Sequence, residues 1–378
     1  MMIVRTAQAA DRDAVLSLAR QAGPGLTTLK PDAEALERRL QRVERTLADV
    51  EPWAQQGYLF VLEDLDTGRV IGVSGIETAV GLSEPFYNYR LGTLVHASRE
   101  LNVWRRMRVL TISNDLTGNA ELCSLFLDPA YRRQGLAPLL SKARFLFIAE
   151  FPQRFPERLC AEMRGHFDEA GESPFWNALG ARFYQIDFNE ADYRSSLGKK
   201  SFVAELMPRY PVYVELLSDE AQACLGATHR ETRAARTLLE GEGMRFEHHI
   251  DIFDAGPVLE VHRDATRAAR DSVRVTVSIL PEGLAPHRTL GEPDVLGLQR
   301  DAEAASAAAV LTARFDADET PHLIACGDPS HFRAALLPHG ASGALGDTVV
   351  LTAEQAEALR VRSGDNARLL PLDAWHPR

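Results

Sequence analysis

The stretch of sequence that decides the fold is residues 121–140, ELCSLFLDPAYRRQGLAPLL. An apolar run suited to a buried strand leads into a Pro-containing turn, and apolar residues at helical spacing follow. Across the turn, Arg132, Gly135 and Ala137 match the pattern R-x-x-G-x-A. The first N–H groups of a helix have no partner within it, and the helix dipole favours negative charge there. The segment therefore predicts a strand, a turn and a helix whose first turn binds a phosphate-containing group.

The turn resembles the one with which GNAT-type N-acyltransferases hold coenzyme A. Gly135 has no Cβ, so the backbone can approach a pyrophosphate closely, and the arginines of the turn add positive charge. The preceding strand can offer backbone groups near Leu125 to the pantetheine amides. From this segment alone, the alternative is an ordinary helix start with two solvated arginines. The predicted contacts to acyl-CoA are Leu125, Leu127, Arg132, Arg133, Gln134, Gly135, Leu136 and Ala137.

The amino-acid composition indicates an ordinary globular protein and argues against some functional classes. The chain has 378 residues, a net charge of −11, 45% hydrophobic residues and 25% charged residues, as ordinary globular proteins do. The acidic balance argues against a nucleic-acid binder, which normally carries a basic face. The four cysteines are far apart, so we expect no metal site and a reducing, cytoplasmic location. The longest apolar stretch, residues 135–151, is interrupted by Lys142 and Arg144, so we expect a buried helix and no membrane span.

The order of predicted elements indicates an α+β fold with a mixed central sheet flanked by helices. Segments with strand patterns are residues 2–6, 57–63, 69–76, 109–113, 122–127, 158–163 and 182–188. Segments with helical patterns are residues 8–22, 31–50, 135–151 and 174–179. The order that follows the Gly-containing turn is that of a GNAT-like acyl-CoA N-acyltransferase domain, which we assign to residues 1–190.

Two further domains are expected. Residues 191–261 form an αβ extension that completes the active site, with strands at 212–217 and 245–253 around a helix at 231–239. A faint echo between LGARFYQIDF (179–188) and EGMRFEHHIDIF (242–253) suggests that this extension is a second GNAT-like αβ half. Residues 262–378 contain an Ala-rich segment, frequent Gly and Pro, and an alternating strand pattern at 272–280, which predict a small β-rich domain.

Longer blocks carry a more specific resemblance, which covers residues 1 to about 260. They include EPFYNYRLG (84–92), NDLTGNAELCSLFL (114–127), LLSKARFLFIAEF (139–151) and DIFDAGP (251–257). Through these blocks the chain resembles the bacterial arginine N-succinyltransferases, including the arginine/ornithine-specific subunits. The resemblance implies transfer of a succinyl group from succinyl-CoA, a co-substrate rather than a bound cofactor, to the α-amine of L-arginine. That reaction opens an arginine catabolic route. A homodimer, or a hetero-oligomer with a paralogous subunit, is also implied.

The resemblance places the family's proton donor on His229 and its succinyl-CoA contact on Leu125. Read by themselves, Thr228 and Glu231 form a capping-box pattern before an apolar run, which puts His229 in the first turn of a helix. The helix dipole there favours a neutral imidazole, which can accept the amine proton and then protonate the CoA thiolate. The alternative is a solvated first-turn histidine.

The two substrates make opposite demands on charge. The free carboxylate of a succinyl group needs a cation, for which Arg90 and Arg164 are candidates, and a guanidinium needs carboxylates. Candidates for the guanidinium site are Asp115, Glu121 and Asp254. Two other functions remain open at this stage. The chain could prefer ornithine or another amine, or it could be a non-catalytic subunit that binds arginine or acyl-CoA.

Overall fold

The computed structural model describes residues 1–23, 26, 28–196, 201–280, 321–337, 344–345 and 347–372. These residues belong to two compact units, each assembled from segments that are distant in the sequence. The larger unit contains Ala7–Val61 and Val70–Arg270. The smaller unit contains Met1–Thr6, Leu62–Arg69 and Asp271–Arg378. The three expected domains, with boundaries at 190 and 261, remain a prediction.

The larger unit is built on a mixed sheet with the strand order β2-β3-β6-β7-β10-β9-β4-β5-β8. The contact between β6 and β7 is parallel, whereas β3–β6, β7–β10, β10–β9, β9–β4, β4–β5 and β5–β8 are antiparallel. The mixed sheet predicted from the sequence is confirmed. The strands are β2 (Gly57–Asp64), β3 (Arg69–Glu77), β4 (Asn88–Ser98), β5 (Val103–Ser113), β6 (Ala120–Leu127), β7 (Arg158–Glu162), β8 (Val212–Tyr213), β9 (Arg245–Asp251) and β10 (Pro257–His262).

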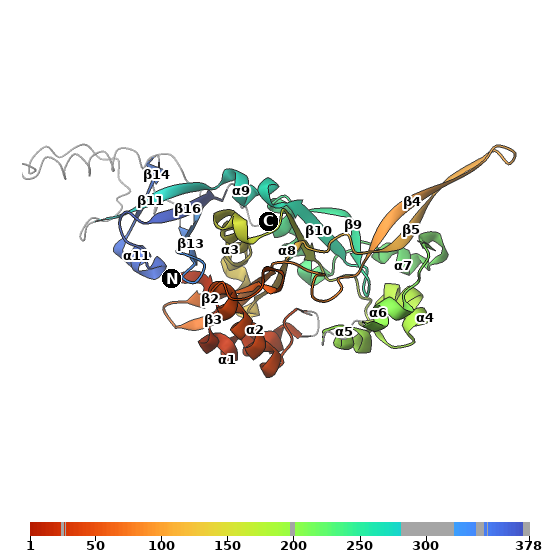
Figure 1. Ribbon diagram of the computed structural model, residues 1–378, viewed down its shortest axis with the longest axis horizontal. Coiled ribbons are helices and arrows are strands. Elements are labelled where there is room, and N and C mark those ends of the chain that lie inside the picture. The colour runs from red at the N-terminus through yellow and green to blue at the C-terminus, as the bar shows by residue number, and fades with distance from the viewer. Residues whose placement is uncertain are drawn as a thin grey trace, which may run out of the picture. The chain divides into compact units, whose positions relative to one another are not determined.

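Helices cover both faces of this sheet near β2. Leu59 and Val61 share an apolar core with helices α1 (Arg12–Ala22) and α2 (Ala33–Leu47). Because side chains alternate along a strand, Tyr58 and Phe60 point the other way, and both rings lie 5.0 Å from the ring of Phe147. Phe147 belongs to α3 (Leu136–Glu150), which lies on the side of the sheet away from α1 and α2 (Figure 1). Burial on both faces explains why this strand is apolar without alternation.

A second core surrounds Trp176 and includes residues of β4, β5 and β9. The strand expected at 182–188 is wrong, because the π-helix Trp176–Gly180 runs directly into α4 (Ala181–Tyr184). That continuation stacks the ring of Tyr184 on the Trp176 indole, with centroids 5.3 Å apart. The two echoing segments therefore differ in structure, since one is helical and the other is β9. The remaining helices of this unit are α5 (Phe188–Ser196), α6 (Ser201–Leu206), α7 (Asp219–Cys224), α8 (Arg233–Gly241) and α9 (Arg267–Asp271).

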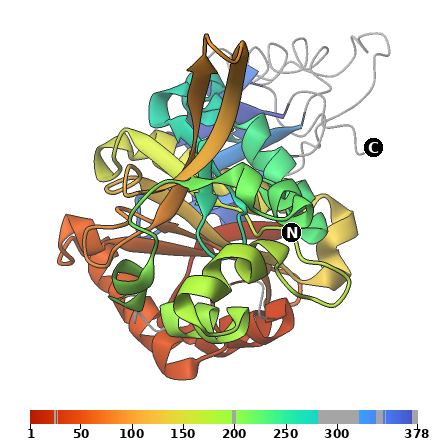
Figure 2. The same ribbon diagram turned by 90° about the vertical axis from the view of Figure 1, so that its right-hand side faces the viewer.

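Two other strand predictions differ in length. The strand expected at 212–217 is only β8, because a 3₁₀ turn follows at Val214–Leu216. In contrast, β5 is much longer than the expected 109–113 and pairs with β4 along its whole length. The resulting hairpin extends away from the rest of its unit (Figures 1 and 2), and Trp104 and Leu101 near its tip are 63% and 72% exposed.

The smaller unit is a seven-stranded sheet of order β14-β15-β11-β16-β12-β13-β1 with one helix, α11 (Ala353–Leu359), in the described part. Its pairs are antiparallel except β11–β15. The strand expected at 272–280 is confirmed as β11, whereas the Ala-rich segment lies outside the described residues. The strands are β1 (Met2–Thr6), β11 (Val273–Ile279), β12 (His322–Cys326), β13 (Arg333–Leu337), β14 (Ala344–Leu345), β15 (Thr348–Leu351) and β16 (Asn366–Pro371).

Candidate active site

The site lies where the two parallel strands β6 and β7 separate. They pair only at their start, Ala120 with Leu159 and Glu121 with Cys160. Beyond this point β6 continues beside β3, and β7 continues beside β10. A pocket of about 970 Å³ lies within the larger unit, and residues 121–125 and 162–164 of the two diverging chains line it. The divergence exposes strand backbone that a ligand with amide groups can bind.

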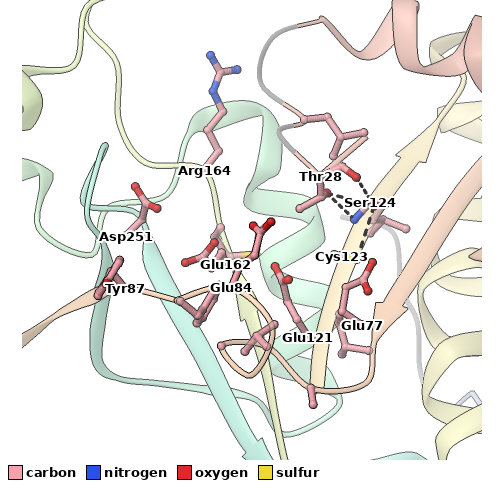
Figure 3. A pocket seen from close by; sticks show the side chains of 18 of the residues that line it. Thr28, Glu77, Glu84, Tyr87, Glu121, Cys123, Ser124, Glu162, Arg164 and Asp251 are labelled. Carbon is pink, nitrogen blue, oxygen red and sulfur yellow. Dashed lines mark hydrogen bonds between the residues drawn. The ribbon is translucent and has the colours of Figure 1, made fainter. Parts of the chain in front are cut away.

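A bulge in β6 shapes the pocket wall. Ser124 is buried and has φ +54°, and the pairing register with β3 shifts at this point. The Ser124 N–H donates to Thr28 Oγ1 at 3.0 Å, and its hydroxyl donates to the Thr28 carbonyl at 3.1 Å (Figure 3). Arg39 Nη1 donates both to Ser124 Oγ at 2.9 Å and to the Thr28 carbonyl at 2.7 Å. These bonds replace the ladder contacts that the bulge removes.

The predicted turn forms as expected at the end of β6. A 3₁₀ segment at Pro129–Gln134 is capped by Asp128, which accepts from the Ala130 N–H, and Gly135 is left-handed with φ +70°. Only a glycine adopts this conformation without strain, and α3 begins directly after it. Arg132 is exposed; its Nε donates to the Leu127 carbonyl at 3.2 Å, and its guanidinium lies 5.5 Å from the Phe126 ring.

The pocket and this turn are separate parts of the site. Leu125 lines the pocket, whereas the described lining residues do not include Leu127, Arg132, Gly135, Leu136 or Ala137. Leu127 and Leu136 are buried core residues. Arg133 and Gln134 belong to the 3₁₀ segment, and their side chains lie outside the described part of the structure. Their contacts remain a prediction.

His229 lies beside the pocket rather than in its lining. Its N–H donates to the carbonyl of the lining residue Arg164 at 2.8 Å, and its own carbonyl accepts from Thr232, another lining residue. The side chain is 14% exposed, and Nδ1 accepts from the Glu231 N–H at 3.3 Å. Burial, followed by the charge of Arg164, lowers the pKa of His229 below its ordinary value. A neutral ring is therefore the favoured form at neutral pH.

The predicted cap at Thr228 is wrong. His229 itself is the N-cap residue of a short 3₁₀ turn, Arg230–Thr232, and α8 begins only at Arg233. The Thr228 hydroxyl instead accepts from Arg236 Nη1 at 2.9 Å. An imidazole nitrogen can accept a hydrogen bond from a backbone N–H, as a serine or threonine hydroxyl does. His229 therefore caps this turn in place of the expected Thr228.

Carboxylates are the most frequent charged groups of the pocket. Glu121 and Asp254, two of the predicted candidates, line it, whereas Asp115 forms an exposed ion pair with Arg90 at 2.8 Å outside the described lining. Asp254 accepts from the N–H groups of Gly165 and Gly256, and burial raises its pKa. Glu162, at the end of β7, also lines the pocket. The carboxylates that sequence reasoning missed are Glu51, Glu77, Glu84, Asp192 and Asp251, several of which gather in Figure 3.

Five arginines also line the pocket, and one of them was predicted. That one, Arg164, extends away from the labelled carboxylates (Figure 3) and lies 4.7 Å from the Phe167 ring. Arg39 and Arg42 both pair with Glu77, at 3.3 and 2.7 Å. Arg38, on the exposed face of α2, lies 3.8 Å from Glu34, and the fifth arginine is Arg144 of α3. Helical periodicity could not identify the four arginines of α2 and α3 as site residues, because α2 has the pattern of an ordinary amphipathic helix and α3 that of a buried helix.

Within the described residues, no group of three or more His, Cys, Asp or Glu side chains is arranged to hold a metal ion. The described helices are also too short or too polar to cross a membrane. All four cysteines are buried and free.

Comparison with known proteins agrees with this geometry. Family models described as "Arginine N-succinyltransferase beta subunit" and as its C-terminal domain match residues 2–268 and 307–371. Arginine N-succinyltransferases from Salmonella schwarzengrund and Salmonella typhi are each 45% identical over 374 residues, which is 99% of this chain and 98% of theirs. The solved arginine/ornithine succinyltransferase subunit AI from Pseudomonas aeruginosa matches with a TM-score of 0.81 and 34% identity, covering 99% of both chains. This match and the diverging parallel strands confirm the predicted GNAT-like fold. The chain belongs to the arginine N-succinyltransferase family.

Proposed function

We propose that this chain transfers the succinyl group of succinyl-CoA to the α-amine of L-arginine, releasing N2-succinyl-L-arginine and CoA. The observation that carries the proposal is the 45% identity with arginine N-succinyltransferases over nearly the whole of both chains. The pocket supports it, because it offers both arginines for a carboxylate and carboxylates for a guanidinium. Succinyl-CoA acts here as a co-substrate, and no permanently bound cofactor is required.

The acyl-CoA is held by the end of β6 and the start of α3. Its pantetheine amides pair with the strand backbone near Leu125, where β7 has diverged. Its pyrophosphate lies on the N–H groups that follow Gly135, where the helix dipole favours negative charge. Arg132 is exposed at this turn and can add positive charge. Leu127, Arg133, Gln134, Leu136 and Ala137 complete the proposed contact.

The reaction is direct attack without an acyl-enzyme. The ammonium of arginine first releases one proton to solvent, and the neutral amine then attacks the thioester carbonyl carbon. An amide bond forms, the C–S bond breaks, and the nitrogen loses a second proton to His229. The imidazolium returns this proton to the CoA thiolate, so the net products are the amide, CoA thiol and one proton. The lowered pKa of His229 supports its role as the acceptor.

The hydrogen bond at Nδ1 bears on this role. While Nδ1 accepts the Glu231 N–H, the neutral ring carries its proton on Nε2 and cannot accept there. The Glu231 carboxylate lies 3.9 Å from Nδ1. Rotation of the ring toward this carboxylate favours the other tautomer, in which Nε2 has released its proton to solvent and Nδ1 has gained one. Nε2 can then act as a base.

A second candidate function is a preference for ornithine, which the name of the Pseudomonas aeruginosa relative favours. That relative is also called a subunit, so a non-catalytic chain that binds arginine or acyl-CoA beside a paralogous partner is a third. A homodimer or such a hetero-oligomer, and a cytoplasmic location, remain predictions.

The test is to purify the chain and follow thiol release from succinyl-CoA with L-arginine, L-ornithine, L-lysine and Nα-acetyl-L-arginine. We expect release with L-arginine, a product heavier by one succinyl group, and no reaction with the Nα-blocked control. Faster release with ornithine would favour the second function. Binding of succinyl-CoA without thiol release for any amine would favour the non-catalytic subunit and contradict our proposal.

A further inference from the structure

Helix α3 carries two buried cationic side chains, which differ in whether a carboxylate of the described chain pairs with them. Lys142 and Arg144 are 8% and 1% exposed. Lys142 forms an ion pair with Glu242, which is itself fully buried. Residues two apart on a helix point in different directions, so Arg144 points to another part of the interior.

Arg144 contacts only neutral groups among the described residues. Its Nε donates to the Ser141 carbonyl at 3.3 Å, Nη1 to the Cys123 carbonyl at 3.2 Å, and Nη2 to Ser141 Oγ at 3.2 Å. No carboxylate of the described chain lies within ion-pair distance of it. Burial of an unpaired charge is unfavourable, and burial lowers the pKa of Arg144 to about 10.

The guanidinium keeps two donors for a further partner. It has five N–H groups, and the three hydrogen bonds use one each on Nε, Nη1 and Nη2. The remaining two N–H groups, one on each Nη, have no hydrogen-bond partner among the described residues and can donate to a carboxylate. Arg144 also lines the pocket, together with Cys123, Ser124 and Leu125 of β6. Arg144 is therefore part of the wall of the proposed acyl-CoA site.

The geometry points to Arg144 as the residue that binds the free carboxylate of the succinyl group and so selects succinyl-CoA over uncharged acyl-CoAs. This inference rests on the proposed function. The other four pocket arginines are less suited. Arg39 and Arg42 are paired with Glu77, Arg38 is exposed beside Glu34, and Arg164 is half-buried on the Phe167 ring. A carboxylate ligand would provide the counter-charge that the described residues do not supply.

The experiment compares succinyl-CoA with butyryl-CoA, which has the same four-carbon chain with a methyl group in place of the carboxylate. With saturating L-arginine, kcat/KM is measured from thiol release for the wild type, Arg144→Met, Arg144→Lys and the matched control Arg164→Met. We expect the wild type to prefer succinyl-CoA by about 10³-fold, because a site built for a polar group rejects the analogue that lacks it. Arg144→Met should lower kcat/KM for succinyl-CoA by about 10²-fold and for butyryl-CoA by less than about threefold.

A structural role would give a different result. If Arg144 only holds the Cys123 carbonyl, Arg144→Met lowers kcat/KM equally for both acyl-CoAs, and the inference is overturned. Loss of the preference in Arg164→Met instead of Arg144→Met overturns it as well. Should Arg144→Met fail to fold, Arg144→Lys should retain part of the preference, and a wild type that uses both acyl-CoAs equally refutes the inference without any variant. A wild type inactive with succinyl-CoA contradicts the proposed function itself, and the inference falls with it.

Discussion

The two sides of helix α3 differ in how they accommodate a buried positive charge. On the side toward α8, Lys142 meets Glu242, whose second oxygen accepts the Ala268 N–H at 3.0 Å. On the side toward β6, Arg144 donates to one hydroxyl and two carbonyl groups, and among the described residues it has no carboxylate partner. When a buried cation has a carboxylate partner, its charge is compensated within the protein, and loss of either partner destabilises the fold. A buried cation without one keeps binding capacity for a charged ligand.

The paired side also bears on the candidate catalytic residue. Helix α8 follows the turn capped by His229 and ends directly before Glu242. The Lys142–Glu242 contact therefore fixes one end of α8, while His229 lies just before the other end. One side of α3 therefore contacts the residue that follows α8, and the other side carries the proposed carboxylate site.

The largest effect is expected from Glu242→Gln. It leaves the buried Lys142 ammonium without a counter-charge, so the free energy of unfolding should fall by about 3–5 kcal/mol. Urea denaturation of the whole chain measures this change. The matched control is Glu240→Gln, which removes a partly exposed pair with Arg236 and should cost less than about 1 kcal/mol. Equal losses for the two variants would show that the buried Lys142–Glu242 pair matters no more to stability than a partly exposed pair.

A loss of activity without a loss of stability is expected from His229→Ala. Turnover should fall by about 10²-fold or more, the usual contribution of a general acid–base group. Binding of succinyl-CoA, measured by calorimetry, should persist, and the urea midpoint should change little. His331→Ala, an exposed histidine of the smaller unit paired with Asp328, is the control and should leave turnover unchanged. Unchanged turnover in His229→Ala would remove this residue from the mechanism.

At the start of α3, Gly135→Ala should weaken binding of CoA. A side chain in the left-handed conformation at φ +70° costs about 1–2 kcal/mol, and relief of that strain would distort the N–H groups offered to the pyrophosphate. We expect the Kd for CoA to rise by about tenfold, as calorimetry can show. The control is Gly241→Ala at the end of α8, where an added Cβ meets open space and the helix should be slightly stabilised. Equal Kd values for both variants would place the pyrophosphate elsewhere.

The smallest effect concerns pH. Because the neutral imidazole is the proposed base and its pKa is lowered, the limb of kcat/KM that reports His229 should lie below the ordinary histidine pKa of about 6.5, separate from the limb of the substrate ammonium at higher pH. Activity is thus retained at a pH where an unperturbed histidine would already be protonated. Arg164→Gln removes one cause of the lowered pKa and should move the limb to higher pH. A limb that stays in place would show that the charge of Arg164 does not contribute to the lowered pKa of His229.

Local sequence patterns correctly predicted those helices, strands and turns whose structure is determined by residues close to them in the chain. The β6–turn–α3 segment is specified by its apolar strand, its Asp-Pro start and Gly135, and all three appear where expected. The strand expected at 182–188 failed because its aromatic residues pack a helical cluster around Trp176, which alternation cannot distinguish from a strand face.

The pocket depended on contacts that no local pattern encodes. Arg39 reaches Ser124 across 85 positions, and Glu77 joins the same network from β3. In the sequence, Arg144 is only an interruption of an apolar stretch, because its proposed role depends on the absence of a carboxylate partner among the described residues. His229 was found through resemblance, and the local pattern then assigned its cap to the wrong residue, Thr228.

The pairing of β1 with β13 has a consequence for synthesis. Ile3 lies opposite Ala335, about 330 residues later in the chain. At a translation rate of about 5–20 residues per second, the first strand leaves the ribosome roughly 15–65 seconds before this partner exists. During that interval its edge is open to any other strand, so the smaller unit is the part of the molecule whose assembly should depend most on chaperones during translation.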